Sequence, residues 1–298
     1  MAGENVLSSG LGGSLTIWSL AVSSAFSTDL TVFAAAGAGG VYRSRTAGDS
    51  WSEVSQGLDG AFVNDLAISP AFTRDATLFA ASIQNGVFRS MDAGDSWSPV
   101  IRGLPSPSVW TIELSSDFDS DHTLFVGTIT GVYRSTDGGD SWKETATLPG
   151  SLNVRALALP PSYGKDATLM ASTLDGLFRS TDGGDSWHPK SQGLAGTSVW
   201  AIAPSPAFSS DSTIFAGTNE DGVYRSTDAG STWTQANKAL ADRLVFALAT
   251  SPRFETDSLM FAGTGAGVFR GVDIQPAPTP TPVPEPLPRS VSGLLGWG

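Results

Sequence analysis

The sequence contains no cysteine among its 298 residues and only two histidines. The absence of cysteine excludes disulfide bonds, thiol catalysis and cysteine metal sites together. His122 and His188 fall in different turns without a companion ligand pattern, so we expect no metal site and no cofactor. Charged residues are also scarce, at 15%, and 29 acidic residues against 17 basic ones leave a net charge of −12. An acidic surface argues against nucleic acid or an anionic membrane as the main partner.

Long hydrophobic runs are absent as well. No stretch approaches the 18 or more apolar residues of a transmembrane helix, so we expect no direct membrane insertion. The first 20 residues show no basic region followed by an apolar run, and we expect no signal peptide in this sequence. Hydrophobic residues nevertheless make up 40% of the chain, which permits a sizeable core. The 34 glycines and 18 prolines suit many short strands joined by turns.

One phrase recurs along the chain at a fixed spacing. It reads GVYRSTDGGDSW at residues 131–142, and close variants stand at 41–51, 86–97, 176–187 and 222–233. Successive arginines of the phrase are 45 or 46 residues apart, and a sixth continues the series: Arg43, Arg89, Arg134, Arg179, Arg225 and Arg270. A fixed period in this range indicates a repeat architecture.

Each repeat contains four segments that have the alternation and β-branched residues of strands. The first is apolar, as in VWTIELS from Val109, and a turn such as SPAFTRD at 69–75 leads to the second. The third is the GVYRS segment, and the glycine-rich phrase turns the chain into the fourth. Four strands per unit, repeated radially, are typical of a β-propeller. We therefore predict an all-β fold with four-stranded antiparallel blades.

Six such units are present. The first strands are expected near Ile17, Val63, Val109, Val154, Val199 and Val245. The last unit ends with GVFRGVD at 267–273 and lacks a fourth strand, whereas ENVLSSGL at 4–11 aligns with the fourth strand WSEVSQGL at 51–58. We therefore predict a six-bladed propeller over residues 1–273, in which the N-terminal strand completes the last blade and closes the ring.

Residues 274–298 form a second region. Alternating Pro and Thr favour an extended linker, and the segment ends in the apolar sequence SGLLGWG at 292–298. Such tails commonly space a domain from a surface or an assembly. We accordingly expect an extracellular or cell-surface location, with self-assembly through the tail as an open alternative.

The repeated phrase resembles the Asp-box, or BNR repeat, whose pattern is Ser-x-Asp-x-Gly-x-Thr/Ser-Trp. The first copy departs from this pattern because Thr46 stands in place of the Asp. The Asp and Trp of the four full copies are Asp92 and Trp97, Asp137 and Trp142, Asp182 and Trp187, and Asp228 and Trp233. The resemblance implies a propeller of the superfamily that includes sialidases, sortilin-type domains and a photosystem assembly factor. That superfamily mixes enzymes, receptors and scaffolds.

We interpret the box as a structural turn. The Asp carboxylate can accept N–H groups of the glycine turn, and the Trp ring can pack into the blade. The resemblance places this turn on the face opposite the usual active site. A residue that a site needs once should not recur in every unit, and the same reasoning gives the repeated arginine a strand-edge ion pair or a packing role between blades.

Catalytic residues are not recognisable. The sialidase RIP motif is absent, no Tyr–Glu nucleophile pair is evident, and Tyr42, Tyr133 and Tyr224 are repeat positions. The sequence DFDSD at 117–121 has calcium-like spacing but lacks the later Gly and Glu of a calcium loop. We therefore name no catalytic residue and no metal ligand, and the sequence favours a protein that is not an enzyme.

The positions at which the repeats differ are the candidate binding site. By analogy with the family, the first strand begins at the mouth of the central channel, where the loops between second and third strands also open. Aromatic rings beside amides and carboxylates there suit a sugar, a peptide or a protein hot spot. The alternative is that the rings pack between blades. The first strands contribute Trp18, Asn64, Trp110, Arg155, Trp200 and Phe246, and the loops contribute Asn85, Asp175 and Glu220.

The sequence therefore favours a non-catalytic binding or scaffold propeller that presents one face to a protein or glycan partner. The first alternative is a carbohydrate-active protein, either a lectin-like module or a sialidase-like glycoside hydrolase. A further alternative, an assembly factor for a membrane complex, follows from the family resemblance alone.

Overall fold

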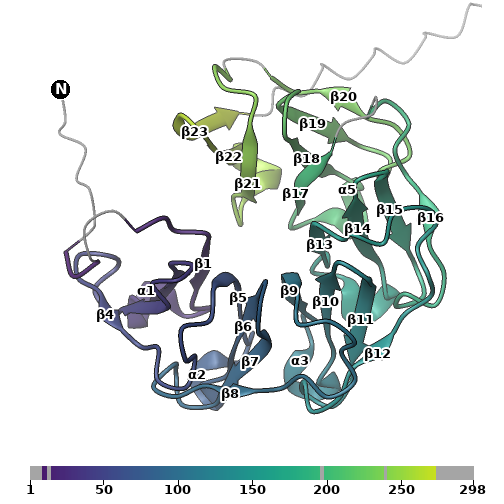
Figure 1. Cartoon of the computed structure of the whole chain (residues 1–298). Coiled ribbons are helices and arrows are strands. Elements are labelled where there is room, and N and C mark those ends of the chain that lie inside the picture. Colours follow the sequence, from purple (N-terminus) through teal and green to yellow (C-terminus); the bar gives the residue numbers. More distant parts are fainter. Residues whose placement is uncertain (1–8, 12–14, 195–197, 238–239, 273–298) are drawn as a thin grey trace, which may run out of the picture.

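The computed structural model describes residues 9–11, 15–194, 198–237 and 240–272, which form a β-propeller of six blades (Figure 1). Six antiparallel sheets follow one another in chain order around a central axis, which confirms the predicted architecture. Five sheets have four strands, and the sixth has three within the described residues.

Every blade is built in the same order from the axis outward. The inner strands are β1 (Ser19–Val22), β5 (Val63–Ile68), β9 (Val109–Leu114), β13 (Ala156–Ala158), β17 (Val199–Pro204) and β21 (Val245–Thr250). The second strands are β2 (Val32–Ala35), β6 (Leu78–Ser82), β10 (Leu124–Thr128), β14 (Leu169–Thr173), β18 (Ile214–Thr218) and β22 (Leu259–Thr264). The third strands are β3 (Val41–Ser44), β7 (Gly86–Ser90), β11 (Gly131–Ser135), β15 (Gly176–Ser180), β19 (Val223–Ser226) and β23 (Gly267–Val272). The short fourth strands are β4 (Ser52–Glu53), β8 (Ser98–Pro99), β12 (Lys143–Glu144), β16 (His188–Pro189) and β20 (Thr234–Gln235).

A one-turn helix occupies the turn between first and second strands, where the sequence predicted only a turn. The helices are α1 (Phe26–Asp29), α2 (Phe72–Asp75), α3 (Phe118–Asp121), α4 (Tyr163–Asp166), α5 (Phe208–Asp211) and α6 (Phe254–Asp257). In α2, Asp75 accepts a hydrogen bond from the Ser69 hydroxyl (2.6 Å) and another from the Thr77 backbone N–H (2.9 Å). Asp121 makes the same contacts in α3, so the acidic residue of DFDSD stabilises a turn.

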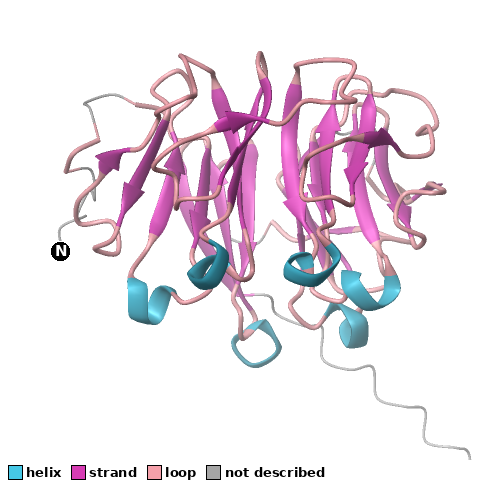
Figure 2. Cartoon of the chain, turned by 90° about the horizontal axis from the view of Figure 1, so that it is seen from below, coloured by secondary structure: helices cyan, strands magenta, loops and turns pink. Residues whose placement is uncertain are grey.

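The two ends of the propeller differ in structure. All six helices lie at one end (Figure 2). The Asp-box turns lie there too, because the backbone N–H of Ala93 in the second box donates to the carbonyl of Ala76 at the end of α2 (2.9 Å). The antiparallel order places the starts of the inner strands, and the loops between second and third strands, at the opposite end. We call that opposite end the channel-mouth face.

The hydrophobic core lies between blades. Five clusters of buried side chains each combine two consecutive blades, from blades 1 and 2 to blades 5 and 6. The box tryptophan extends each contact. Trp97 of blade 2 donates its indole N–H to the carbonyl of Val54 in blade 1 (2.8 Å) and its backbone N–H to the carbonyl of Gln56 (2.9 Å). Trp142 and Trp233 repeat both contacts at later interfaces.

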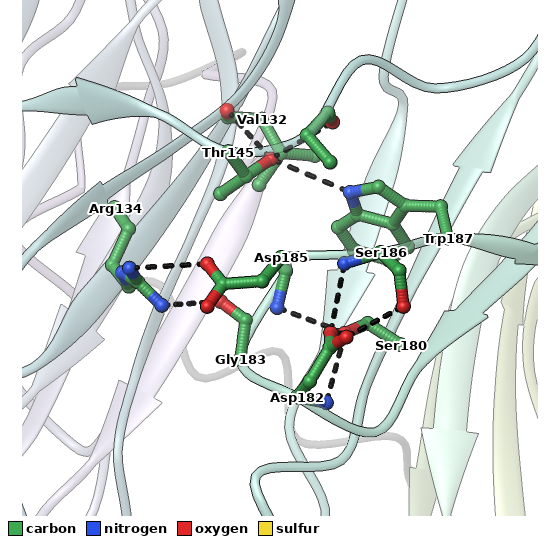
Figure 3. Close-up of polar contacts among 11 residues, drawn as sticks. Val132, Arg134, Thr145, Ser180, Asp182, Gly183, Asp185, Ser186 and Trp187 are labelled. Atoms are coloured by element: carbon green, nitrogen blue, oxygen red, sulfur yellow. Dashed lines mark hydrogen bonds and ion pairs between the residues drawn. The ribbon is translucent and has the colours of Figure 1, made fainter.

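The repeated arginine forms the second part of this interblade contact. Arg134 of blade 3 donates to the buried carbonyl of Gly183 in the box turn of blade 4 (2.9 Å) and pairs with Asp185 (3.3 Å; Figure 3). The same contact joins Arg43 to the box of blade 2 and Arg89 to that of blade 3. Each of these box turns is therefore held by an arginine of the preceding blade.

At the seam between blade 6 and blade 1, no arginine bond to the box of blade 1 is found among the described residues. Val268 in β23 is 77% exposed, although its five equivalents are at most 2% exposed. Phe261 in β22 is 37% exposed, whereas the equivalent side chains are at most 1% exposed. Across the seam, Leu20 in β1 is 60% exposed, while the equivalent Leu66 is 6% exposed. The two blades that flank the seam thus have exposed apolar faces.

The predicted fourth strand of blade 6 lies mostly in residues 1–8, outside the described residues. Its register can still be predicted from Ser9, whose carbonyl accepts the Trp51 backbone N–H (2.9 Å), as the Gln56 carbonyl does for Trp97. Ser9 therefore corresponds to Gln56, and Val6, three residues earlier, corresponds to Glu53. Glu53 is opposite Tyr42 in blade 1, so Val6 should be opposite Phe269, the residue of β23 that corresponds to Tyr42.

Replacing Arg134 by Met should weaken the contact between blades 3 and 4. The change keeps the apolar stem but leaves the buried Gly183 carbonyl without its charged donor, so we expect the free energy of unfolding to fall by about 1–3 kcal/mol. The matched control is Asp185→Asn, which removes the exposed end of the ion pair and should cost less than about 1 kcal/mol. Urea unfolding followed by tryptophan fluorescence measures both, and equal losses would contradict the assignment.

The N-terminal register can be tested by disulfide formation because the chain has no cysteine of its own. The protein with both Val6→Cys and Phe269→Cys should form a disulfide rapidly under mild oxidation. Residues directly opposite each other on antiparallel strands have Cα atoms within about 5 Å, which a disulfide can span. Tyr42→Cys with Glu53→Cys is the positive control in blade 1. Val6→Cys with Arg270→Cys should link poorly because a shift of one residue reverses the side-chain face. Efficient linkage of that shifted pair alone would show a different register.

Candidate binding site at the channel mouth

The structure brings the differing residues of the inner strands together in neighbouring pairs at the channel mouth. In blades 2 to 4, the Asn64 side-chain amide donates to the Trp110 carbonyl (2.7 Å). The guanidinium carbon of Arg155 lies 4.1 Å from the centroid of the Trp110 ring. These three residues therefore form a continuous cluster over three blades.

A second group of rings completes the mouth. Trp200 and Phe246 of blades 5 and 6 lie with ring centroids 5.4 Å apart at an interplanar angle of 35°. Trp18 of blade 1 meets Phe62 edge-on, with centroids 5.3 Å apart. Exposed fractions are 52% for Trp18, 36% for Trp200 and 49% for Phe246. These three rings are not enclosed between blades, whereas Asn64 is only 8% exposed.

The loop residues have different environments. Asp175 accepts a hydrogen bond from the Ser151 backbone N–H (2.5 Å), so it fixes the segment that leads into blade 4. Asn85 is exposed, and its backbone N–H donates to the Ser82 hydroxyl (3.1 Å). Glu220 is exposed in the loop before β19. Ile129 and Leu174, in the equivalent loops of blades 3 and 4, add exposed aliphatic surface.

The cluster of blades 2 to 4 contains several buried polar atoms without a hydrogen-bond partner among the described residues. They are the side-chain oxygens of Asn64 and Asn153, the indole nitrogen of Trp110 and Nε of Arg155. Burial also lowers the pKa of Arg155. Most buried polar atoms in proteins have a partner, so these atoms are ones that a ligand or ordered water can satisfy.

Two carboxylates of the channel wall are not among the residues predicted from the sequence. Asp65 accepts hydrogen bonds from the Ser19 hydroxyl (2.9 Å) and from the backbone N–H groups of Leu66 (2.9 Å) and Ile112 (3.0 Å), so it links three blades. Burial raises the pKa of Asp65. Burial, with a smaller effect from the Asp65 charge, raises the pKa of Glu113 to about 8. Glu113 therefore keeps its proton at neutral pH.

A signal for Glu113 is present in the repeats. The equivalent residues of the other five inner strands are all alanine: Ala21, Ala67, Ala158, Ala203 and Ala249. Five blades fold with alanine at this position, so the scaffold does not require the carboxylic acid of Glu113 there. Glu113 lies three residues after Trp110 on the same strand. It is therefore outside the set of equivalent inner-strand positions from which the binding residues were predicted.

The Asp boxes lie at the helix end, away from this site. In blade 4, Asp182 accepts hydrogen bonds from the hydroxyl (2.5 Å) and backbone N–H (2.9 Å) of Ser186, and from the Ser180 hydroxyl (2.7 Å; Figure 3). These bonds, chiefly that of the Ser186 hydroxyl, lower the pKa of Asp182 to about 2. Asp92, Asp137 and Asp228 have the same partners in their own boxes.

The glycine of the box meets two requirements at once. Gly139 has φ of +95°, and a Cβ atom there would lie 2.9 Å from the Phe79 ring of the preceding blade. In the first box, the Thr46 hydroxyl replaces the Asp carboxylate and accepts the Ser50 backbone N–H (3.0 Å) in the same role. The box is thus both a turn and a contact surface between blades.

Metal and membrane-spanning features are absent from the described ranges. No group of three His, Asp or Glu side chains there is arranged to hold a metal ion. Within the same residues, no helix is long and apolar enough to cross a membrane. A shallow pocket lies between blades 5 and 6, lined by Val223, Leu240 and Phe269 among others, and it does not include the channel-mouth residues.

Glu113 should make stability depend on pH. Its folded-state pKa of about 8 exceeds the usual value of 4.5, so the folded protein binds this proton more tightly than the unfolded chain. Its contribution to stability is therefore complete below about pH 4.5 and is lost as pH rises toward 8. We expect the free energy of unfolding of Glu113→Gln, measured with urea, to rise relative to that of the parent when the pH is changed from 5 to 8. Glu144→Gln, at an exposed position of β12, is the control, and equal pH profiles for parent and Glu113→Gln would refute the prediction.

Comparisons with known proteins agree with this geometry. The BNR/Asp-box repeat family model matches residues 178–189, which span the box of blade 4. No curated protein matches the sequence. Among solved structures, an ancestral GH74 enzyme shares 18% identity with a TM-score of 0.67, over 88% of this chain and 36% of that chain. The present chain thus spans about a third of that enzyme.

Two other solved structures are similar in fold. A structure of YCF48 bound to D1 peptide shares 18% identity with a TM-score of 0.63, over 89% of this chain and 81% of that chain. The extracellular domain of a putative one component system from B. thetaiotaomicron shares 14% identity with a TM-score of 0.62, over 85% and 32% of the two chains. At these identities the likeness concerns the fold. The chain is a six-bladed β-propeller in which the box of blade 4 matches the BNR/Asp-box repeat, and related box contacts recur between blades (Figure 3).

Proposed function

We propose that this protein is a non-catalytic binding propeller that presents its channel-mouth face to a polypeptide partner. The observation that carries the proposal is the distribution of exposed apolar side chains. Trp18, Ile129, Leu174, Trp200 and Phe246 lie on that face. Exposed apolar groups that lie together on one face are typical of an interaction surface, and several other exposed apolar side chains, among them Leu20, Phe261 and Val268, flank the seam.

The composition of the face favours a polypeptide. Aliphatic Ile129 and Leu174 supply apolar area without the flat surface that stacks against a sugar ring. Protein interfaces are enriched in aromatic residues and arginine, which the mouth provides in Trp110 and Arg155. The similar propeller YCF48, described with a bound D1 peptide, supports such a role for this fold.

A glycan partner is the second candidate. The exposed Trp200 and Phe246 rings lie close together and could stack on sugars. Several similar propellers belong to GH74 enzymes, which include a xyloglucanase from Xanthomonas campestris. Glycoside hydrolysis receives less support, because Asp65, the carboxylate whose charge acts on Glu113, is already held by three hydrogen bonds.

Cell-surface placement belongs to the same proposal. Two similar propellers are extracellular domains of sensor systems. Residues 274–298 would then act as the spacer, with self-assembly through this tail and a role in assembling a membrane complex as further options. These roles depend on the partner and not on the fold.

The proposal can be tested by selecting a random-peptide phage library on the intact protein, beside a glycan array. Peptides should be enriched, and the Trp200→Ala, Phe246→Ala variant should bind them at least about 30-fold less tightly, as expected for hot-spot residues. Met91→Ala removes an exposed apolar residue at the helix end and should leave binding unchanged. Glycan binding that the double variant loses, without peptide enrichment, would replace the polypeptide by a sugar. No ligand in either assay would refute the proposed function.

A further inference from the structure

Arg155 is the one cation among the six equivalent inner-strand positions at the channel mouth. The other five blades have Trp18, Asn64, Trp110, Trp200 and Phe246 there. A scaffold that tolerates three tryptophans, a phenylalanine and an asparagine has no structural requirement for a charge at this position. The arginine therefore needs an explanation of its own.

The Arg155 guanidinium differs from the repeated arginines in its partners. Arg43, Arg89 and Arg134 each pair with an aspartate of the next blade. For Arg155, the described part of the chain provides only the Trp110 ring, 4.1 Å from the guanidinium carbon, and Nε is buried without a hydrogen-bond partner. Burial lowers the pKa of Arg155, and the ion pairs found among the described residues do not include it.

This isolation occurs in a protein of net charge −12 with 29 acidic residues. A partly buried cation without a counter-ion is unfavourable, and a carboxylate would relieve it by a charge-assisted pair. Stacking on Trp110 holds the guanidinium plane in place, which suits the planar, two-pronged geometry of a carboxylate. The overall negative charge disfavours ligands with many negative charges, so a single carboxylate fits better than a phosphate polymer.

Two residues near Arg155 set further requirements for a ligand, a hydrogen-bond donor and an apolar group. Asn64 is nine-tenths buried, and its amide nitrogen is engaged with the Trp110 carbonyl, so its free side-chain oxygen requires a donor. A backbone N–H of a peptide supplies one. Ile129 follows Thr128, whose carbonyl accepts the N–H of Val154 (2.9 Å), so the backbones that carry exposed Ile129 and Arg155 are paired at adjacent residues.

We infer that the Arg155–Trp110 pair is a subsite for the carboxylate of an Asp or Glu side chain, in a peptide segment with apolar residues on either side. The inference rests on the proposed function, and it specifies the chemistry that the channel-mouth face recognises. Arg155 supplies the charged donors, the Asn64 oxygen accepts a backbone N–H, and Ile129 contacts an apolar flank.

The test uses the same peptide selection on the intact protein, followed by binding measurements with individual peptides. Peptides selected on the parent should be enriched in Asp or Glu next to apolar residues. Arg155→Met, which keeps the stem over Trp110, should weaken a selected peptide roughly 10- to 100-fold. Arg155→Lys should restore only part of this loss because it lacks the planar fork. Arg74→Met, at the helix end, is the matched control and should have no effect.

A double-mutant cycle separates the carboxylate contact from general packing. Changing the peptide Asp or Glu to Asn or Gln should weaken binding to the parent as much as Arg155→Met does, and should cost little further in the Arg155→Met protein. If the losses of binding free energy from the peptide change and from Arg155→Met simply add, the peptide carboxylate does not contact Arg155 and the inference is overturned. The channel-mouth face remains a peptide site in that case. Selected peptides without acidic residues, which still require Trp200 and Phe246, overturn the subsite in the same way. Failure to select any peptide overturns both the subsite and the polypeptide partner.

Discussion

The fold depends on the contact that blades 1 to 4 each make with the box turn of the blade that follows. Arg89 in a third strand donates to the Gly138 carbonyl of the following box, and Trp142 of that box donates back to the Val100 carbonyl of the preceding blade. Burying either carbonyl without its donor would be costly, and the apolar clusters join the same pairs of blades. The strands can be short because the blades are joined mainly by side chains that pack between sheets, and less by long runs of backbone hydrogen bonds.

This arrangement separates stability from recognition. The one-turn helices of all six repeats lie at the helix end (Figure 2), and the boxes of the first five repeats and the arginines that contact them lie there with little variation. The channel-mouth face carries the inner-strand starts and the loops between second and third strands, and there the repeats differ. Substitutions at the mouth leave the interblade contacts intact, which is how a regular scaffold supports an irregular surface.

Sequence periodicity was sufficient to predict the blades and the strand order, since each unit repeats the same pattern of strands and turns, whereas the position of the mouth was predicted from the family resemblance. It did not show the one-turn helices, because four residues leave no helical period to detect. The exposed seam faces beside Leu20 and Val268 were also beyond it, because an alignment of units compares sequences and does not measure the angle between sheets. The Arg155–Trp110 contact requires neighbouring blades in space, whereas Glu113 could have been found from its column of alanines.

The interblade contact has a consequence for how such a chain can evolve. Each of the first five units carries both an arginine in its third strand and a box tryptophan. Between consecutive boxed blades the arginine reaches forward and the tryptophan reaches backward, as Arg89 and Trp142 do. A duplicated unit therefore matches both of its neighbours at once, without compensating changes on either side. Gene duplication can add or remove a blade more easily than point mutation can alter a single interface, because the two halves of that interface belong to different copies of the unit.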